Sequence, residues 1–441
     1  MAGVGMRARR RIFAVKRDRV STTLEALAGI VIAITGLLTV VLTLFEKSYE
    51  VIELPKAVGN WVFWLSAGVL CLLGSWLFKR SRVRPSVLLR PEAMRLVAAN
   101  PHHLIGRQDE IAQLERLCLD HTLVFLTGES GAGKTALVQA GLAPTLRADR
   151  RLLPLYVQVW GQDWEEGPRV ATGQALWNGL TAEQREDAGL EGFPDGLSQL
   201  FEHLLNVRYA LGITPLLIFD QFDDYQTRHR TQFFTEQGRT WLSAAAVRER
   251  NAFWDGVASL LNSDRAHCLF VTRADRADGL EAVRFTEPRV FRLDRLQGRY
   301  VGSLLARLTA TEDSASPIIQ NPEQGWTKLS ERLERDLVSD GFALPQQVNT
   351  VLAGLQQLRY LTTADYDRAG QTTGLEALHI EACIRGAARK AGIPEDVVRA
   401  LLLKMTESAG PRKTSLQTVP QLQELAGVAE FQRIFQLAAG R

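Results

Sequence analysis

The residues with the clearest chemical meaning are eight consecutive ones, 128–135, with the sequence Gly-Glu-Ser-Gly-Ala-Gly-Lys-Thr. They match the pattern of a phosphate-binding loop, in which Gly, four residues, Gly, Lys and Ser or Thr follow one another. Such a loop turns several backbone N–H groups toward a phosphate chain, which requires backbone angles and a close approach that glycine tolerates best. The residues expected to contact a nucleotide here are Gly128, Ser130, Gly131, Ala132, Gly133, Lys134, Thr135 and Ala136.

Two side chains of this loop have separate expected roles. Lys134 supplies a mobile positive charge for the β- and γ-phosphates, and Thr135 offers a hydroxyl to Mg²⁺. The helix expected at 135–142 adds its positive N-terminal dipole. The alternative is a glycine-rich turn with a chance lysine, but the apolar strand expected at 122–127 and the helix that follows favour a phosphate-binding loop.

A metal site also needs a carboxylate on a nearby strand. Residues 214–219 end in four apolar residues and are followed by Asp220, as expected for a buried parallel strand with an acid at its carboxyl end. Asp220 is predicted to hold Mg²⁺ through water. Gln221 stands where a fast hydrolase usually has a glutamate, so Asp223 or Asp224 is the candidate base. The alternative for these two aspartates is a solvated loop.

A third apolar run, 267–272, ends in Arg273. An arginine at the carboxyl end of a strand beside the γ-phosphate could sense which nucleotide is bound, because its planar guanidinium reads phosphate oxygens in a fixed geometry. The alternative is an ordinary ion pair with Asp275 or Asp278.

Positioning these groups requires a parallel sheet. Strands expected at 122–127, 152–159, 214–219, 267–272 and 288–293 alternate with helices such as 197–209 and 240–261. This order predicts an α/β fold whose parallel sheet is covered on both faces, with the nucleotide at the carboxyl edge. The predicted domains are a core at 104–298, a helical lid at 299–373 and a winged-helix-like unit at 374–441.

Composition narrows the functional classes. The chain has 441 residues, of which 46% are hydrophobic and 23% charged, and a net charge of +3. The balance is globular, and so small an excess of positive charge predicts no direct nucleic-acid binding. The 4 cysteines form no CxxC pair and the 7 histidines have no ligand spacing, which argues against a disulfide framework or zinc site.

The N-terminal part predicts a membrane hairpin. After a basic segment at 1–25 come two uncharged runs, 26–45 and 58–78, each long enough to cross a hydrocarbon core of about 30 Å. Arginine and lysine flank the pair, so both termini are expected in the cytoplasm, with the hairpin (26–78) in the inner-membrane lipid bilayer and a linker at 79–103. The alternatives are a cleaved signal peptide and buried core helices.

These motifs together resemble the bacterial STAND class of P-loop NTPases, signalling proteins related to AAA+ ATPases. The likeness extends from about residue 104 to the C-terminus. It lies in Ile-Gly-Arg at 105–107, the loop at 128–135 with Ala-Gly-Leu-Ala-Pro at 140–144, Phe-Asp-Gln-Phe-Asp-Asp at 219–224, Val-Thr-Arg-Ala-Asp at 271–275, Ala-Leu-Pro at 343–345, and 361–374. The resemblance implies that Ile105, Gly106 and Arg107 contact adenine, that Pro345 neighbours the nucleotide, and that the cofactors are ATP or ADP with Mg²⁺.

The resemblance also implies a mechanism. In this class ADP holds the core closed, ATP opens it, and the opened cores associate, so a homo-oligomer is expected. We expect a slow ATPase, because Asp223 and Asp224 replace longer glutamates, and a separate sensor or trigger protein, because the chain ends at Arg441 without the usual repeats. Here the hairpin would be the effector, in anti-phage defence. The alternative is an AAA-like motor or remodeller with the hairpin as a passive anchor.

Overall fold

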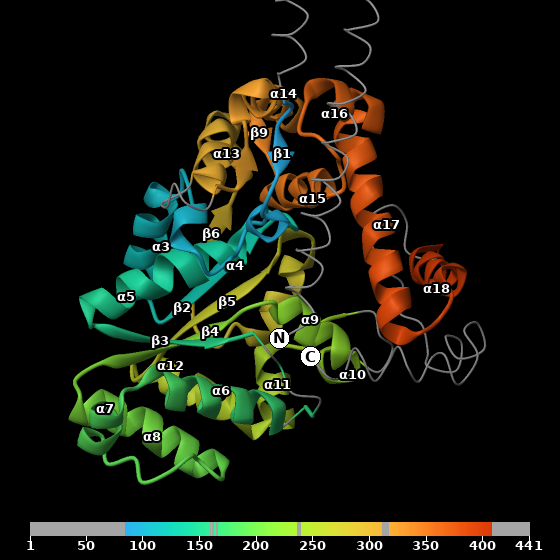
Figure 1. The fold of residues 1–441 in the computed structure, drawn as a ribbon. Coiled ribbons are helices and arrows are strands. Elements are labelled where there is room, and N and C mark those ends of the chain that lie inside the picture. Colours follow the sequence, from blue (N-terminus) through green and yellow to red (C-terminus); the bar gives the residue numbers. More distant parts are fainter. Residues whose placement is uncertain are drawn as a thin grey trace, which may run out of the picture. The chain divides into compact units, whose positions relative to one another are not determined.

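The computed structural model describes residues 84–158, 160, 163–164, 166–235, 240–310 and 317–407. The chain divides into two units, Met1–Pro85 and Ser86–Arg441, and almost all described residues belong to the second. Within that unit an α/β core is followed by a set of helices (Figure 1).

The core is built on a five-stranded parallel sheet, as the alternating pattern predicts (Figure 1). Its strands, in spatial order, are β3 (Leu152–Val157), β4 (Thr214–Phe219), β5 (His267–Arg273), β2 (Leu123–Gly128) and β6 (Arg289–Leu293). Because β5 lies between β2 and β4, the phosphate-loop strand and the Asp220 strand are not neighbours. The carboxyl ends of all three lie at one edge, so Gly128, Asp220 and Arg273 come near one another.

Each face of the sheet is buried against helices, and alternate strand residues serve the two faces. On one face Leu216 and Ile218 of β4 pack with α3 (Gln108–Asp120) and with the phosphate-loop helix. That helix runs from Lys134 to Asp149 through α4 (Lys134–Ala136), a π-helical segment (Leu137–Leu142) and α5 (Ala143–Asp149). Burial on both faces explains why the strands are continuously apolar.

The opposite face holds a second, larger core that includes Leu217 and Phe219 of β4. Its helices are α6 (Glu166–Gly179), α7 (Ala182–Asp187), α8 (Leu197–Ala210), α9 (Phe222–Arg228), α10 (Arg230–Phe233), α11 (Ala244–Arg250), α12 (Ala252–Asn262) and a 3-10 segment (Ala274–Val283). The stretch predicted as helical at 240–261 is two helices, because Asn251 has extended backbone angles and caps α12 through its side chain.

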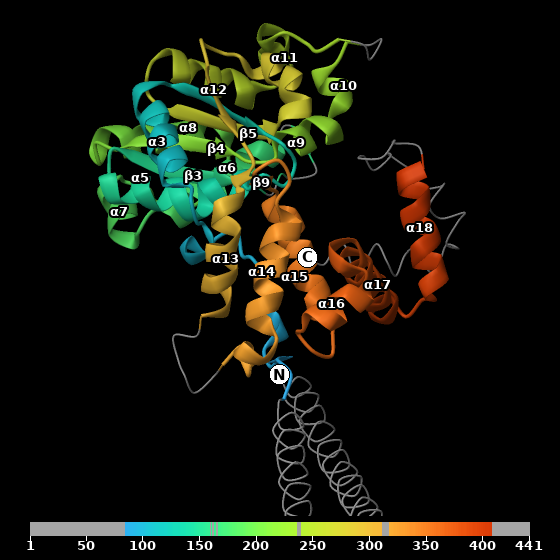
Figure 2. The same cartoon turned by 90° about the horizontal axis from the view of Figure 1, so that it is seen from above.

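The helices after β6 form the region that we call the lid (Figure 2). It contains α13 (Val301–Thr309), α14 (Trp326–Leu337), α15 (Pro345–Leu355) and α16 (Thr363–Ala369), packed around one apolar cluster. A short antiparallel pair, β7 (Leu296–Gln297) with β9 (Phe342–Ala343), ties the entry of the lid to the start of α15.

Residues 86–103, which we call the strap, pack on the lid. They include β1 (Val87–Leu88), paired antiparallel with β8 (Ile319–Gln320), and two 3-10 turns, Pro91–Ala93 and Pro101–His103. Met94 is fully buried in the lid cluster. The buried hydroxyl of Ser86 donates to the Asn321 carbonyl at 2.7 Å and accepts the Trp326 backbone N–H at 2.9 Å. The strap therefore packs as part of the lid, although it precedes the core in sequence.

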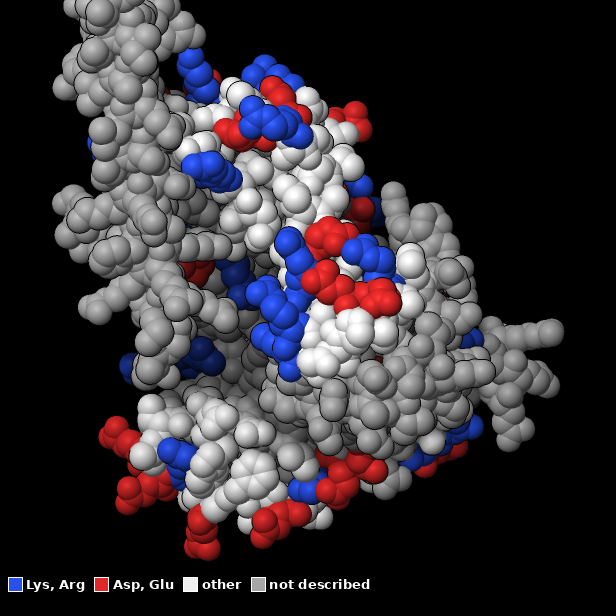
Figure 3. Space-filling model, turned by 45° about the vertical axis from the view of Figure 1, so that its right-hand side comes forward, with Lys and Arg blue, Asp and Glu red and all other residues white. Residues whose placement is uncertain are grey.

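Two further helices follow, α17 (Gln371–Ala391) and α18 (Glu395–Glu407). Arg399 of α18 donates two hydrogen bonds, 2.8 and 2.7 Å long, to Glu381 of α17. Basic and acidic side chains stand next to one another on the face shown in Figure 3. The rest of the predicted winged-helix-like unit, 408–441, lies outside the described residues.

The membrane prediction is corrected at this point. Its two spans, 26–45 and 58–78, lie outside the described residues. Across the part of the chain that the structure does describe, no helix combines the length and apolar content needed to cross a bilayer. The longest, α17, has 21 residues but includes Glu376, Glu381, Arg385, Arg389 and Lys390, charges that are costly in hydrocarbon. The predicted inner-membrane location with two spans and cytoplasmic termini is therefore wrong for the chain as the structure describes it.

Candidate functional site

A cavity of about 470 Å³ opens at the carboxyl edge of the sheet, between the core and the lid. Most of the predicted site residues line it, namely Ile105, Arg107, Ser130, Gly131, Ala132, Gly133, Lys134, Thr135, Ala136, Asp220, Asp223, Asp224, Arg273 and Pro345. Gly106 and Gly128 do not. The structure thus brings together predicted residues from five separate stretches of the sequence.

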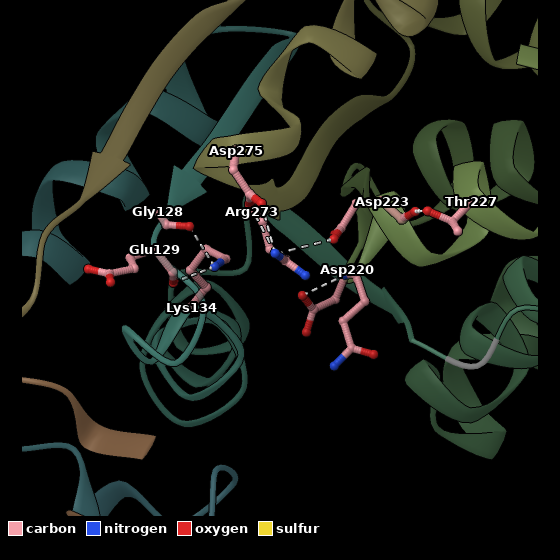
Figure 4. A network of polar contacts seen from close by, with 9 residues as sticks. Gly128, Glu129, Lys134, Asp220, Asp223, Thr227, Arg273 and Asp275 are labelled. Atoms are coloured by element: carbon pink, nitrogen blue, oxygen red, sulfur yellow. Dashed lines mark hydrogen bonds and ion pairs between the residues drawn. The ribbon is translucent and has the colours of Figure 1, made fainter. Parts of the chain in front are cut away.

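The phosphate loop has the backbone form that its glycines predict. Gly131 and Gly133 have φ angles of +80° and +98°, a region that side chains other than glycine rarely adopt. Lys134 folds back over the loop, and its Nζ donates to the carbonyls of Gly128 and Glu129 at 2.9 and 3.0 Å (Figure 4). Burial lowers the pKa of the Lys134 ammonium, so an anion placed beside it would relieve a desolvated charge.

Asp220 and Thr135 meet as a metal site requires. The Thr135 hydroxyl donates to Asp220 Oδ2 at 2.8 Å, and the Gln221 backbone N–H donates to Oδ1 at 2.8 Å. Asp220 is only 1% exposed. A hydroxyl beside a buried carboxylate is a hard oxygen donor set that fits Mg²⁺. When bound, the ion would neutralise phosphate charge.

Gln221 has a strained backbone. Its φ of 53° and ψ of 41° are left-handed, which is unusual for a residue with a side chain. This conformation turns the chain so that α9 begins at the next residue. Strained residues of this kind cluster at functional sites.

The pair of aspartates after Gln221 have different surroundings. Asp223 is 7% exposed, and burial together with the neighbouring Asp224 raises its pKa, whereas Arg273 and Lys134 act in the opposite direction. Asp224 lines the cavity in a more exposed position. The buried Asp223 therefore holds a proton more readily than a carboxyl in water.

Arg273 lies between two carboxylates (Figure 4). Its guanidinium donates to both oxygens of Asp275, at 3.0 and 2.8 Å, and its Nε is 4.0 Å from Asp223 Oδ2. The ion pair with Asp275 that the sequence raised as an alternative is therefore present, and the arginine also lines the cavity, while its role as a nucleotide sensor stays a prediction.

The three residues expected to contact adenine, 105–107, have different surroundings in the structure. Ile105 lines the cavity, while Gly106, with φ of +69°, lies against the ring of Tyr300. Arg107, which is 4% exposed, donates to Glu110 Oε1 at 2.8 Å and to the carbonyls of Ala132 and Asp294 at 3.2 and 2.9 Å. Its polar contacts therefore brace the phosphate loop against the chain that leaves β6.

The lid touches the phosphate loop directly. Pro345 begins α15 and lies near Gly133, and the backbone N–H of Gln346 donates to the Gly131 carbonyl at 3.3 Å. Asn349, one turn further along α15, also lines the cavity, and its side chain accepts the Leu96 backbone N–H at 2.9 Å. Loop, lid and strap are thus joined around one cavity.

Several of these residues escaped prediction from the sequence. They are Leu96, Val97, Ala98, Asn100, His103 and Leu104 before the core, Leu296, Leu304, Gln346 and Asn349 in the lid region, and Tyr156 at the metal site. Tyr156 donates its phenol hydroxyl to Asp220 Oδ2, and burial and the Asp220 charge raise the pKa of that phenol. The sequence signal that could have indicated Tyr156 is its position as a tyrosine near the carboxyl end of an otherwise aliphatic strand.

Among solved structures the chain is similar to the Walker-type ATPase PABY2304 of Pyrococcus abyssi, with 14% identity, 75% of this chain and 90% of that chain covered, and a TM-score of 0.35. It is also similar to Cdc6p of Pyrobaculum aerophilum, with 14% identity, 76% of this chain and 86% of that chain covered, and a TM-score of 0.34. No curated protein matches.

A family model gives the decisive match. The model for Novel STAND NTPase 1 matches residues 97–440, well over half of the chain. The match includes the phosphate loop, Asp220, Arg273 and the lid. The chain is a P-loop NTPase and belongs to the Novel STAND NTPase 1 family.

Proposed function

We propose that this protein is a nucleotide-controlled signalling switch, which binds ADP or ATP with Mg²⁺ in the cavity and self-associates when ATP is bound. The contact that carries the proposal is the hydrogen bond from Gln346 of the lid to Gly131 of the phosphate loop. Because this bond joins the lid to the loop, a change at the phosphates would reach the helices that follow.

The cavity suits a nucleotide along its length. One part is lined by apolar side chains from strap, core and lid, such as Val97, Ile105 and Leu304, which would accept a base. Lys134, Thr135 and Arg273 line the other, polar part. The choice of ATP over other nucleotides in this proposal is based on the family to which the chain belongs.

A γ-phosphate would change the energetics of this site. A group at the end of the loop would compete with the carbonyls of Gly128 and Glu129 for Lys134 and with Asp275 for Arg273. ADP lacks that group. A ligand shifts a conformational equilibrium only through such a difference in binding between states, which a switch requires.

The residues around Asp220 favour slow turnover. Gln221 cannot act as a base, and the nearby acids are the short side chains Asp223 and Asp224. A slow hydrolysis step would let the ATP-bound state persist long enough to signal. A motor that remodels other proteins would instead need repeated rapid hydrolysis.

The test is the assembly state of the full chain with ADP and with a non-hydrolysable ATP analogue. We expect larger assemblies only with the analogue, and none with Lys134→Ala, which should bind neither nucleotide. Replacing the exposed Lys328 of α14 with alanine is the matched control and should behave as wild type. Equal assembly with both nucleotides, together with steady phosphate release from ATP, would refute the switch and favour a motor. Unchanged nucleotide affinity in Lys134→Ala would refute the site.

A further inference from the structure

Tyr156 reaches Asp220 because of the register of the sheet. Strands β3 and β4 are parallel, with Tyr156 opposite Ile218. Asp220 is two residues beyond Ile218, so the same face of the sheet carries both side chains. Tyr156 and Ile218 pack in the cluster that also holds Leu137 and Val138 of the phosphate-loop helix. The phenol and the carboxylate therefore meet on the face where the phosphate loop lies.

The oxygens of Asp220 are held by three donors. Oδ2 accepts from the hydroxyls of Thr135 and Tyr156, and Oδ1 accepts from the Gln221 backbone N–H. Thr135 lines the cavity and would turn its oxygen toward a cation, whereas Tyr156 is not among the cavity residues and approaches from the neighbouring strand. The phenol can thus hold the carboxylate without competing for the position of the ion.

We infer that Tyr156 is a positioning residue of the metal site, whose hydroxyl orients Asp220 for a divalent cation bound together with the nucleotide. The inference rests on the proposed nucleotide site and assigns a role to a strand that carries none of the sequence motifs. Outer partners of metal-binding groups commonly set metal affinity by fixing the orientation of those groups. Tyr156 touches neither nucleotide nor ion in this role and acts through Asp220.

The test removes only the hydroxyl, with Tyr156→Phe in the full chain. Binding of a fluorescent ADP analogue is titrated with Mg²⁺ and, separately, measured in EDTA. We expect the Mg²⁺ concentration for half-maximal effect to rise about tenfold, the lower end of the range for such partners. Affinity in EDTA should stay as in wild type. Tyr225→Phe is the matched control, because that buried phenol donates to the Trp164 carbonyl at 2.8 Å. It should leave the Mg²⁺ response unchanged.

A double-mutant cycle separates positioning from simple support of the fold. In an Asp220→Asn background, Tyr156→Phe should change the Mg²⁺ response no further. Tyr156→Phe could lower the melting temperature more than Tyr225→Phe does. In that case all titrations are made at a temperature where every variant is folded, and the double-mutant cycle distinguishes a positioning role from support of the fold.

The inference is overturned if wild type responds to Mg²⁺ and Tyr156→Phe responds identically, or if the variant loses affinity equally with Mg²⁺ and with EDTA. Those results leave the nucleotide site standing. A wild-type chain that binds no nucleotide would overturn the proposed function and this inference together.

Discussion

The guanidinium of Arg295 donates two hydrogen bonds, 2.6 and 3.0 Å long, to the carboxylate of Glu129. Glu129 is in the phosphate loop, and Arg295 lies directly before β7, where the chain enters the lid. The pair therefore links the loop to the entry of the lid, in addition to the hydrogen bond from Gln346 to Gly131. Opening of the lid for nucleotide release would strain or break this link.

Arg295→Ala should speed the release of ADP. Both side chains are partly exposed, so the effect is expected to be at most about fivefold, as ion pairs in water contribute little. Stopped-flow release of a fluorescent ADP analogue measures it. Arg151→Ala, which removes an exposed ion pair with Asp149 at the far end of α5, is the control and should leave release unchanged. Release at the wild-type rate in Arg295→Ala would show that the pair does not restrain the lid.

Asp223→Asn should raise stability and lower hydrolysis. Burial and Asp224 raise the Asp223 pKa above its unfolded value, so the ionised carboxylate costs stability at neutral pH despite Arg273 and Lys134. The variant should therefore melt a few degrees higher at pH 7. As pH falls through the raised folded pKa, the wild-type carboxyl takes up a proton, and the difference should vanish below the unfolded pKa of about 4.

Melting curves between about pH 3 and pH 8, with phosphate release measured at pH 7, test this prediction. Asp224→Asn, a change of the same kind in the more exposed neighbour, is the control for surface charge. A difference in melting temperature that persists undiminished at about pH 3 would contradict the assigned burial cost. Unaltered hydrolysis would exclude Asp223 as the base.

Arg273→Ala should weaken ATP binding while sparing ADP. The guanidinium lines the cavity near Asp223 and would meet a group beyond the β-phosphate. Loss of a hydrogen bond to a charged group predicts a reduction of about tenfold or more for ATP. Asp275→Asn, which removes the charge bonded to Arg273, should act in the opposite direction and increase the preference for ATP.

Titrations of both nucleotides in EDTA and in Mg²⁺ measure that preference. Equal losses for ATP and ADP in Arg273→Ala would mean that the arginine only supports the fold. A fall in ATP preference in Asp275→Asn would show that Asp275 presents the arginine to the nucleotide instead of holding it back.

Gly131→Ala should separate the lid from the phosphate loop. A Cβ at Gly131 would lie 2.5 Å from Gln346 Oε1 and 2.6 Å from Gln346 Cβ, and its φ is +80°. Gly212→Ala is a matched control, since its φ is +68° but no atom lies within 4 Å of the added carbon. Gly212→Ala should cost about 1–2 kcal/mol from the backbone alone.

Gly131→Ala should cost more than the control and should also reduce nucleotide affinity. Chemical denaturation and ADP titration measure the two effects. Equal destabilisation in both variants, with affinity intact in both, would show that the contact between loop and lid has no role in binding.

The sequence alone determined the sheet and the chemistry at its edge. Strands at 122–127, 214–219 and 267–272 were predictable because burial on both faces makes each a continuous apolar run ending in a polar group. The phosphate loop was predictable because its backbone demands glycine at fixed spacing. Lys134, Asp220 and Arg273 follow from those two rules, since the carboxyl ends of parallel strands share one edge.

Only the tertiary structure decided which distant residues complete the site. Met94 and Asn100 belong to a stretch rich in prolines, which carries no helical or strand period that could predict packing on the lid. The contact of Tyr156 with Asp220 depends on the register of β3 against β4. The ion pair of Arg295 with Glu129 depends on where the chain turns after β6. Contacts of this kind depend on register and packing between segments far apart in sequence, whereas local periodicity reports only how each segment is buried.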